Sequence, residues 1–234
     1  MENGLIKEVM SIKDHDPKKE IDGVISFNIS NRYACLPLSY NILANQLSAW
    51  RTLFKKLEIL GQDPNRYQGV GYGNLSALTQ IMPQKHQARQ FLITGSQTGG
   101  LTQVSLKDYS LIQSYQLDTH ELKSTGEVLP SSESMTHAAI YELDLDIKYV
   151  FHVHSPIIWH NAQALNLPCT ADHIQYGTRE MARTVQDLYQ QDLFTLGQVL
   201  VMGGHEDGVI CCGRSAEEAG QALIQAWIHA QSLR

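Results

Sequence analysis

The feature that most constrains this chain is a short apolar run at residues 149–156, YVFHVHSP, which holds two histidines one residue apart. If the run is a strand, side chains two residues apart point to the same face. His152 and His154 then converge on one side, while Phe151 and Val153 face the other. Burying two imidazoles together costs desolvation unless a shared partner compensates, and a divalent cation is such a partner. Taken alone, the spacing fits a metal-ligand pair or two core histidines.

Two other stretches carry the residue types that a metal site needs. Residues 130–137, PSSESMTH, are expected to open a helix capped by serine, with Glu133 in its first turn. His137 shares the helical face of Glu133 and either orients its carboxylate or packs in the core. The apolar run 199–202 leads through two glycines to His205. Three imidazoles and a carboxylate suit Zn²⁺ or another divalent ion such as Mn²⁺, Co²⁺ or Fe²⁺.

An ordered set of motifs spans most of the chain. They are GNLS at residues 73–76, TGSQTG at 94–99, SSE at 131–133, HVH at 152–154, GTRE at 177–180 and finally His205. In this order they resemble the class II aldolase/adducin family, the group of L-fuculose-phosphate aldolase. The resemblance implies that His152, His154, His205 and Glu133 hold the metal.

The pattern of elements favours an α/β protein. An amphipathic helix from Ile42 to Leu60, ended by Gly61, precedes short strands, and helices and strands alternate in the last third up to a terminal helix capped by Ser215. This predicts a three-layer α/β/α sandwich with a central mixed or antiparallel sheet. The family resemblance supplies the specific fold.

Domain organisation and composition narrow the class further. Residues 1–20 are polar and are expected to form an N-terminal arm, followed by a single domain over residues 21–234. A formal charge of −6 gives no basic footprint for nucleic acid or anionic membranes. No apolar run approaches the roughly 20 residues that span a bilayer, and no signal peptide is evident, so we expect a cytoplasmic protein. The four cysteines show no paired spacing and are expected to be reduced.

Three polar loops are candidates for substrate binding. They contribute Gly73, Asn74, Ser76, Thr94, Gly95, Ser96, Ser131 and Ser132. Backbone N–H groups and hydroxyls of this kind can form a nest for an anion, although each loop alone also fits an ordinary turn. The resemblance implies that these positions bind the phosphate of a sugar phosphate. One departure is the turn at residues 94–100, TGSQTGG, where relatives usually have Thr-Pro-x-Gly.

The resemblance implies a divalent-metal-dependent aldolase, a lyase that cleaves a phosphorylated or acidic sugar-like substrate through a metal-stabilised enediolate. Glu133 is then the general base or acid, and its identity as Glu favours aldolase over epimerase chemistry, since the resembled epimerases carry Asp there. A second proton donor is expected across a subunit interface, from Asp172 or His173. In the third ligand loop, Glu206 and Asp207 intervene before glycine; either the loop is longer or a carboxylate intrudes on the site.

Alternatives within the resemblance remain open. The same centre serves epimerases, dehydratases of the methylthioribulose-phosphate type and decarboxylases, and adducin head domains keep the fold as interaction modules without the complete metal set. The resemblance also implies a homotetramer with sites at subunit interfaces.

Overall fold

The computed structural model describes residues 25, 27–79 and 89–233; the expected arm at residues 1–20 lies outside them. The strands are β1 (Asn28–Tyr33), β2 (Gly61–Gln62), β3 (Gly71–Tyr72), β4 (Asn74–Leu78), β5 (Phe91–Thr94), β6 (Tyr109–Gln116), β7 (Glu121–Gly126), β8 (Tyr149–His154), β9 (Val199–Val201) and β10 (Gly208–Gly213). The α-helices are α1 (Asn41–Lys56), α2 (Ser134–Tyr141), α3 (Pro156–His160), α4 (Arg179–Gln190) and α5 (Ala216–Gln231). Three short 3₁₀ helices are η1 (Leu38–Tyr40), η2 (Tyr67–Gly69) and η3 (Leu106–Asp108).

One eight-stranded sheet forms the centre of the fold, in the order β1-β7-β6-β5-β4-β8-β10-β9. Its neighbouring strands are antiparallel except for the parallel pair β1 and β7. The sheet is therefore mixed, as predicted. The histidine-bearing strand β8 lies between β4 and β10, away from both edges of the sheet.

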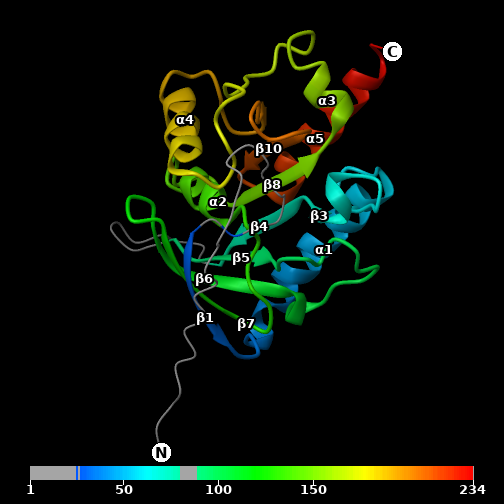
Figure 1. Ribbon diagram of the computed structural model, residues 1–234. Coiled ribbons are helices and arrows are strands. Elements are labelled where there is room, and N and C mark those ends of the chain that lie inside the picture. The colour runs from blue at the N-terminus through cyan, green and yellow to red at the C-terminus, as the bar shows by residue number, and fades with distance from the viewer. Residues whose placement is uncertain (1–24, 26, 80–88, 234) are drawn as a thin grey trace, which may run out of the picture.

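Helices cover both faces of this sheet (Figure 1). Helices α1, α3 and α5 share one apolar cluster with Phe151 and Val153 of β8, whereas α2 and α4 share another with Val150. Successive side chains of β8 thus alternate between two buried faces, because strand side chains have a period of two. The predicted three-layer α/β/α sandwich is confirmed, and the two histidines of β8 belong to the face that α2 and α4 cover.

The first helix is shorter than its sequence pattern predicts. Helix α1 ends at Lys56, and Glu58 adopts the left-handed conformation with φ of 59°. This turn brings Ile59 and Leu60 back into the core as part of the connection to β2 rather than as a last helical turn. Ile42, which the pattern places on the apolar face, is 84% exposed.

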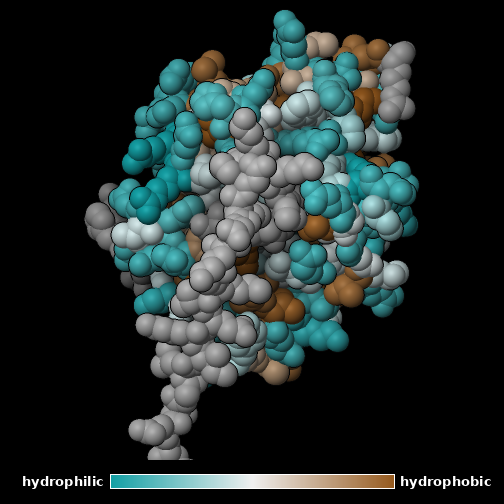
Figure 2. All heavy atoms as spheres, viewed as in Figure 1, coloured by the Kyte–Doolittle hydropathy of each residue, from teal (hydrophilic) through white to brown (hydrophobic). Residues whose placement is uncertain are grey.

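The surface and the cysteines fit the composition. On the face in Figure 2, uncovered residues are mostly hydrophilic, and hydrophobic ones gather in separate groups. None of the helices in the described ranges is both long and apolar enough to cross a bilayer. Cys211 and Cys212 are buried in β10 while Cys35 and Cys169 are exposed, and all four are free thiols.

Candidate metal centre

His152 is held by the sheet with one ring nitrogen engaged. It pairs in register with Asn74 of β4 on one side and Ile210 of β10 on the other. Its Nδ1 donates to the carbonyl of Val209 at 3.0 Å, so the lone pair resides on Nε2. A backbone carbonyl on the second nitrogen is the usual device that orients a metal-binding imidazole.

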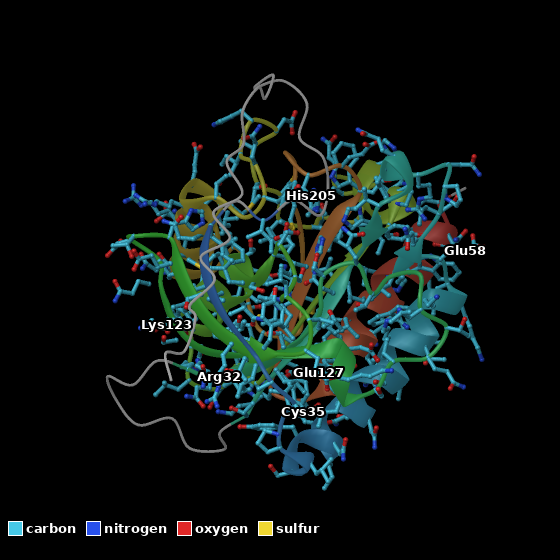
Figure 3. All side chains as sticks on the ribbon, turned by 60° about the horizontal axis from the view of Figure 1, so that its bottom comes forward. Arg32, Cys35, Glu58, Lys123, Glu127 and His205 are labelled. Carbon is cyan, nitrogen blue, oxygen red and sulfur yellow. The ribbon has the colours of Figure 1, made fainter. Side chains whose placement is uncertain are left out.

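His205 reaches the same place from the turn between β9 and β10, where it is labelled in Figure 3. The two glycines before it are required by close packing. A Cβ on Gly203 would lie 2.2 Å from the carbonyl oxygen of Thr170, and a Cβ on Gly204 would lie 2.2 Å from that of Ile174. The turn is therefore pressed against the 170–174 segment, which fixes the direction of His205.

The three imidazoles converge. His152, His154 and His205 each offer a ring nitrogen, and these atoms all lie within 4.8 Å of one another. The Nε2 atoms of His152 and His205 are 3.3 Å apart. Two donors about 2 Å from a zinc ion at the tetrahedral angle are separated by roughly this distance. The arrangement thus fits a divalent cation without a change of strand or turn.

Glu133 adds a carboxylate to the cluster. Glu133, not a serine, is the N-cap residue of α2, so the predicted serine cap is wrong. Glu133 lies one position before the expected first turn and is 2% exposed. Its backbone N–H is held by Ser131 Oγ at 3.3 Å, and its Oε1 lies 3.9 Å from His205 Nε2. Ser131 thus positions the loop that brings the acidic group beside the histidines.

Burial sets the protonation of the cluster. Desolvation lowers the pKa of His152 to about 4. Burial also lowers the pKa values of His154 and His205 well below the ordinary value, and the neighbouring imidazoles lower them further. All three rings are therefore neutral at pH 7, the state in which an imidazole binds a metal.

The insertion after His205 has a specific partner. Asp207 has φ of 61°, and its Oδ2 accepts a 2.6 Å hydrogen bond from the Tyr67 hydroxyl. Arg66 Nη2 donates to the same hydroxyl at 2.7 Å, and the Tyr67 ring stands edge-on to His154 with centroids 4.6 Å apart. The loop is thus longer with His205 still in the cluster, and the inserted carboxylate is engaged by tyrosine.

A second aromatic ring covers His205. The Tyr176 ring centroid is 4.3 Å from that of His205, and Tyr176 is 6% exposed. Neither Tyr67 nor Tyr176 was predicted from sequence. Tyr176 follows the candidate donors Asp172 and His173 closely, but only the packing of the 170–176 segment against the turn reveals its contact.

A pocket opens beside the cluster. Its lining is Gly71, Gly73, Asn74, Gly95, Ser96, Gln97, Thr98, Gly99, Ser131, Ser132, Glu133 and His152. Six of the eight predicted substrate-binding residues are among them. Gln97, Thr98 and Gly99 were not among the substrate-binding residues predicted from sequence. The signal for them was the length of the turn at residues 94–100, the glycine turn, which makes more of its residues available to line a pocket.

The other two predicted substrate-binding residues lie elsewhere. Ser76 is fully buried under α2, and its Oγ is 2.7 Å from His137 Nδ1 and 2.8 Å from the Tyr141 hydroxyl. Thr94 is buried, and its Oγ1 accepts the N–H of Leu75 at 3.2 Å. Both support the walls of the site from within, because their strand positions turn them away from the pocket.

The candidate second proton donors are at the surface of this chain. His173 is exposed and its Nε2 is 3.7 Å from Glu180. Asp172 is exposed as well, close to Gly203. In the part of the chain that the structure describes, neither lines the pocket beside Glu133. Their expected role across a subunit interface stays a prediction.

Fold and site together define an α/β/α protein with a buried histidine–carboxylate cluster. The sequence model of the family described as "Class II Aldolase and Adducin N-terminal domain" matches residues 64–227, more than half of the chain. The chain therefore belongs to the class II aldolase and adducin family. No curated protein sequence matches it.

Solved structures share the fold. An L-fuculose-1-phosphate aldolase from Thermus thermophilus is 17% identical with a TM-score of 0.56, covering 82% of this chain and 92% of its own. A sugar-phosphate aldolase from Thermotoga maritima is 14% identical with a TM-score of 0.57, covering 82% and 94%. YgbL from Escherichia coli, described only as a proposed aldolase, epimerase or decarboxylase, is 18% identical with a TM-score of 0.58, covering 82% and 88%.

Proposed function

We propose that this chain is a divalent-metal-dependent lyase that splits a phosphorylated or acidic sugar-like substrate by retro-aldol cleavage. The observation that supports it most is the convergence of three neutral, buried imidazoles and a carboxylate at the end of a pocket. The pocket offers hydroxyls and backbone amides, the groups that bind an anion. Its relatives in fold include aldolases that act on sugar phosphates.

Each residue of the cluster has a separate role. His152, His154 and His205 would hold a zinc ion or another divalent ion such as Mn²⁺, Co²⁺ or Fe²⁺, together with Glu133 before substrate binds. When bound, such a cation supplies Lewis acidity toward the substrate oxygens and stabilises the negative charge that develops as the carbon–carbon bond breaks. Glu133 lines the pocket beside the cluster, where its carboxylate can move a proton to or from the substrate.

The second proton donor would come from a neighbouring subunit of a homotetramer. The exposure of Asp172 and His173 supports this, because an exposed acid or imidazole is free to enter another subunit's site. Of the variants Asp172→Asn and His173→Asn, the one that removes the donor should then lower turnover while leaving metal content unchanged. Light scattering in solution measures the assembly, and a monomer that turns over substrate would contradict the shared site.

Two other functions use the same fold. An epimerase, dehydratase or decarboxylase would employ the same cluster, and the alanine–aspartate pair Ala171-Asp172 is the residue pattern that favours an epimerase. A non-enzymatic interaction module of the adducin kind is disfavoured, because His152, His154, His205 and Glu133 are all present and brought together.

Metal analysis followed by a substrate screen tests the proposal. The purified chain should contain about one divalent ion, and His152→Ala/His154→Ala should lose it. Phosphorylated ketoses, with an unphosphorylated set alongside, are then incubated in deuterated buffer and the products read by NMR. Two carbonyl fragments support a lyase, whereas deuterium incorporation without bond cleavage counts against it. Retained metal in the double variant would remove the basis of every enzymatic function considered.

A further inference from the structure

Arg51 of α1 is a buried cation whose side chain ends at the glycine turn. It is 1% exposed, although the rest of the buried face of α1 is apolar: Ala44, Leu47 and Phe54. Its Nη2 donates to the carbonyl oxygens of Thr98 at 2.6 Å, Gly99 at 3.2 Å and Leu101 at 3.0 Å. One guanidinium thus gathers three carbonyls of the turn that forms one wall of the pocket.

These hydrogen bonds orient the turn. Thr98 and Gly99 line the pocket, yet their carbonyls point away from it toward α1. The peptide between them is trans, so its N–H, that of Gly99, is directed away from the guanidinium. By drawing the carbonyls back, Arg51 keeps acceptor oxygens out of the pocket wall, where they would repel an anion.

Glycine contacts fix the turn from its other side. A Cβ on Gly99 would lie 2.2 Å from the carbonyl oxygen of Gly61, and a Cβ on Gly95 would lie 2.4 Å from a methyl group of Val128. The turn is therefore clamped between its close neighbours and Arg51. The extra length of this turn relative to the family pattern is what reaches Arg51, since Thr98, Gly99 and Leu101 lie in or just after it.

The charge of Arg51 has no carboxylate partner at close range. Within the described ranges, no Asp or Glu lies within ion-pair distance of it. Burial lowers the pKa of Arg51, and Tyr109 and Asp108 act in the opposite direction, but an arginine remains protonated in proteins. A buried charge without a close ion pair is costly, and carbonyl dipoles and the more distant Asp108 offset only part of that cost.

The pocket, by contrast, lacks a positive charge among its described lining residues. Its described lining contains no lysine or arginine, and its one charged member, Glu133, is acidic. A substrate phosphate or carboxylate bound at the glycine turn would therefore gain from positive potential behind the wall, in addition to the hydroxyls and backbone amides of the lining. Arg51 is the buried cation on that side.

We propose that Arg51 is a positioning residue that shapes the glycine turn and supplies the buried counter-charge for the anionic end of the substrate. This inference rests on the proposed function, because it assumes an anionic substrate in that pocket. The inference adds to that function a residue that favours anionic substrates. Arg51 lies outside the pocket lining, on a helix whose sequence pattern suggests only core packing.

Lys55 provides a matched control on the same helix. Its Nζ donates to Leu101 at 2.8 Å and Gly100 at 3.3 Å, so it contacts the same turn with the same charge. It is far more exposed than Arg51, and water screens its charge. Comparing variants of Arg51 and Lys55 therefore separates the effect of a buried charge from that of any positive charge near the turn.

The test uses inorganic phosphate as the probe and the full-length, metal-loaded protein. Calorimetry measures phosphate affinity for wild type, Arg51→Gln, Arg51→Lys and Lys55→Gln. Arg51→Gln keeps hydrogen-bond donors but removes the charge, and should weaken binding about tenfold or more. Arg51→Lys should recover a large part of the loss, Lys55→Gln should stay within about twofold of wild type, and metal content should be equal in all four.

A second measurement needs no variant. The side-chain Nε–H resonance of Arg51 in wild type should shift on phosphate addition, because the charge of the bound anion acts on the guanidinium. Phosphate affinity of Arg51→Gln within about twofold of wild type, equal losses in Arg51→Gln and Lys55→Gln, or an unmoved resonance under saturating phosphate would each overturn the role of Arg51 alone. If wild type fails to bind phosphate at all, the anionic substrate class of the proposed function fails too.

Discussion

The metal centre and the glycine-turn pocket are neighbours built by different means. The three histidines of the centre are at most 4% exposed, and two of them sit on one strand where the period of two sets their direction. The pocket instead is lined mainly by loops and strand ends far apart in the chain, at residues 71–74, 95–99 and 131–133. Side-chain direction organises the centre, whereas close backbone packing organises the pocket.

This difference teaches that the two regions have separate supports. His152 is oriented by the carbonyl of Val209, and the turn after His205 is held by Tyr67 through Asp207. The glycine turn is held by Arg51 and by the backbone of Gly61. Changes to one set of supports should therefore leave the other region working.

The largest effect is expected at the carboxylate that the two regions share. Glu133→Gln keeps the size of the side chain but removes its ability to accept a proton. Turnover should fall about 10²–10⁴-fold, while the three histidines retain the metal. Steady-state kinetics with metal analysis measures both, and Glu206→Gln, which changes the exposed carboxylate next to His205, is the control. Near-normal turnover in Glu133→Gln would remove its assigned role.

A methyl group added to the glycine turn should abolish anion binding in the pocket and leave the metal centre intact. Gly99→Ala places a Cβ 2.2 Å from the Gly61 carbonyl oxygen, which forces the backbone to move. We expect a loss of about 1–3 kcal/mol in the free energy of unfolding and a loss of phosphate binding, with metal stoichiometry unchanged.

The adjacent glycine is the control for that variant. A Cβ on Gly100 would meet only the side chain of Gln62, with Oε1 at 2.5 Å, and a long side chain can move aside. Gly100→Ala should therefore cost little in thermal denaturation and calorimetry. If Gly99→Ala also loses the metal, the two regions are not separable.

A smaller effect is expected from the hydrogen bond between Tyr67 and Asp207, which supports the metal centre. Tyr67→Phe keeps the ring against His154 but loses the hydrogen bond to Asp207. Metal affinity, measured by competition with a chelator, should weaken about tenfold, as for other residues that orient metal ligands. Tyr72→Phe is the matched control, because the Tyr72 ring also contacts His154 while its hydroxyl accepts from Arg66. Equal effects in the two variants would contradict the role of the Asp207 contact.

The smallest effect concerns pH. Burial lowers the pKa of His137 well below its ordinary value, and the neighbouring imidazole of His152 lowers it further. The folded chain then binds fewer protons than the unfolded chain as pH falls below about 6.5, so this residue's contribution destabilises the fold at lower pH.

Replacing that imidazole should flatten the pH profile. Between about pH 7 and pH 5, the free energy of unfolding of metal-free His137→Gln should fall by roughly 1–2 kcal/mol less than that of wild type. Denaturant titrations at several pH values measure this, with the exposed His229→Gln as the control. Parallel profiles for wild type and His137→Gln would show that His137 is not held neutral.

The layers of the fold and the members of the metal cluster were within reach of the sequence. The spacing of His152 and His154 sets their common face, because a strand's geometry is local. The family resemblance added His205 and Glu133 to the set. Element ends were less accessible: α1 stops at Lys56, because a left-handed residue at Glu58 redirects the chain.

The positions of Ser76 and Thr94 show where sequence reasoning stops. Both belong to motifs shared with relatives, yet one hydrogen-bonds under α2 and the other holds the N–H of Leu75. A motif names residues that are close in the chain. Which of them faces the pocket depends on the strand register.

By itself, the sequence determined the alternating strand with its two histidines, the serine cap of the terminal helix and the α/β class, since these follow from local periodicity and backbone preference. Only the tertiary structure decided that Tyr67 engages Asp207, that Tyr176 covers His205, and that Arg51 reaches the glycine turn. These contacts join segments up to 140 residues apart. Their physical origin is the packing of separate layers, which no local pattern encodes.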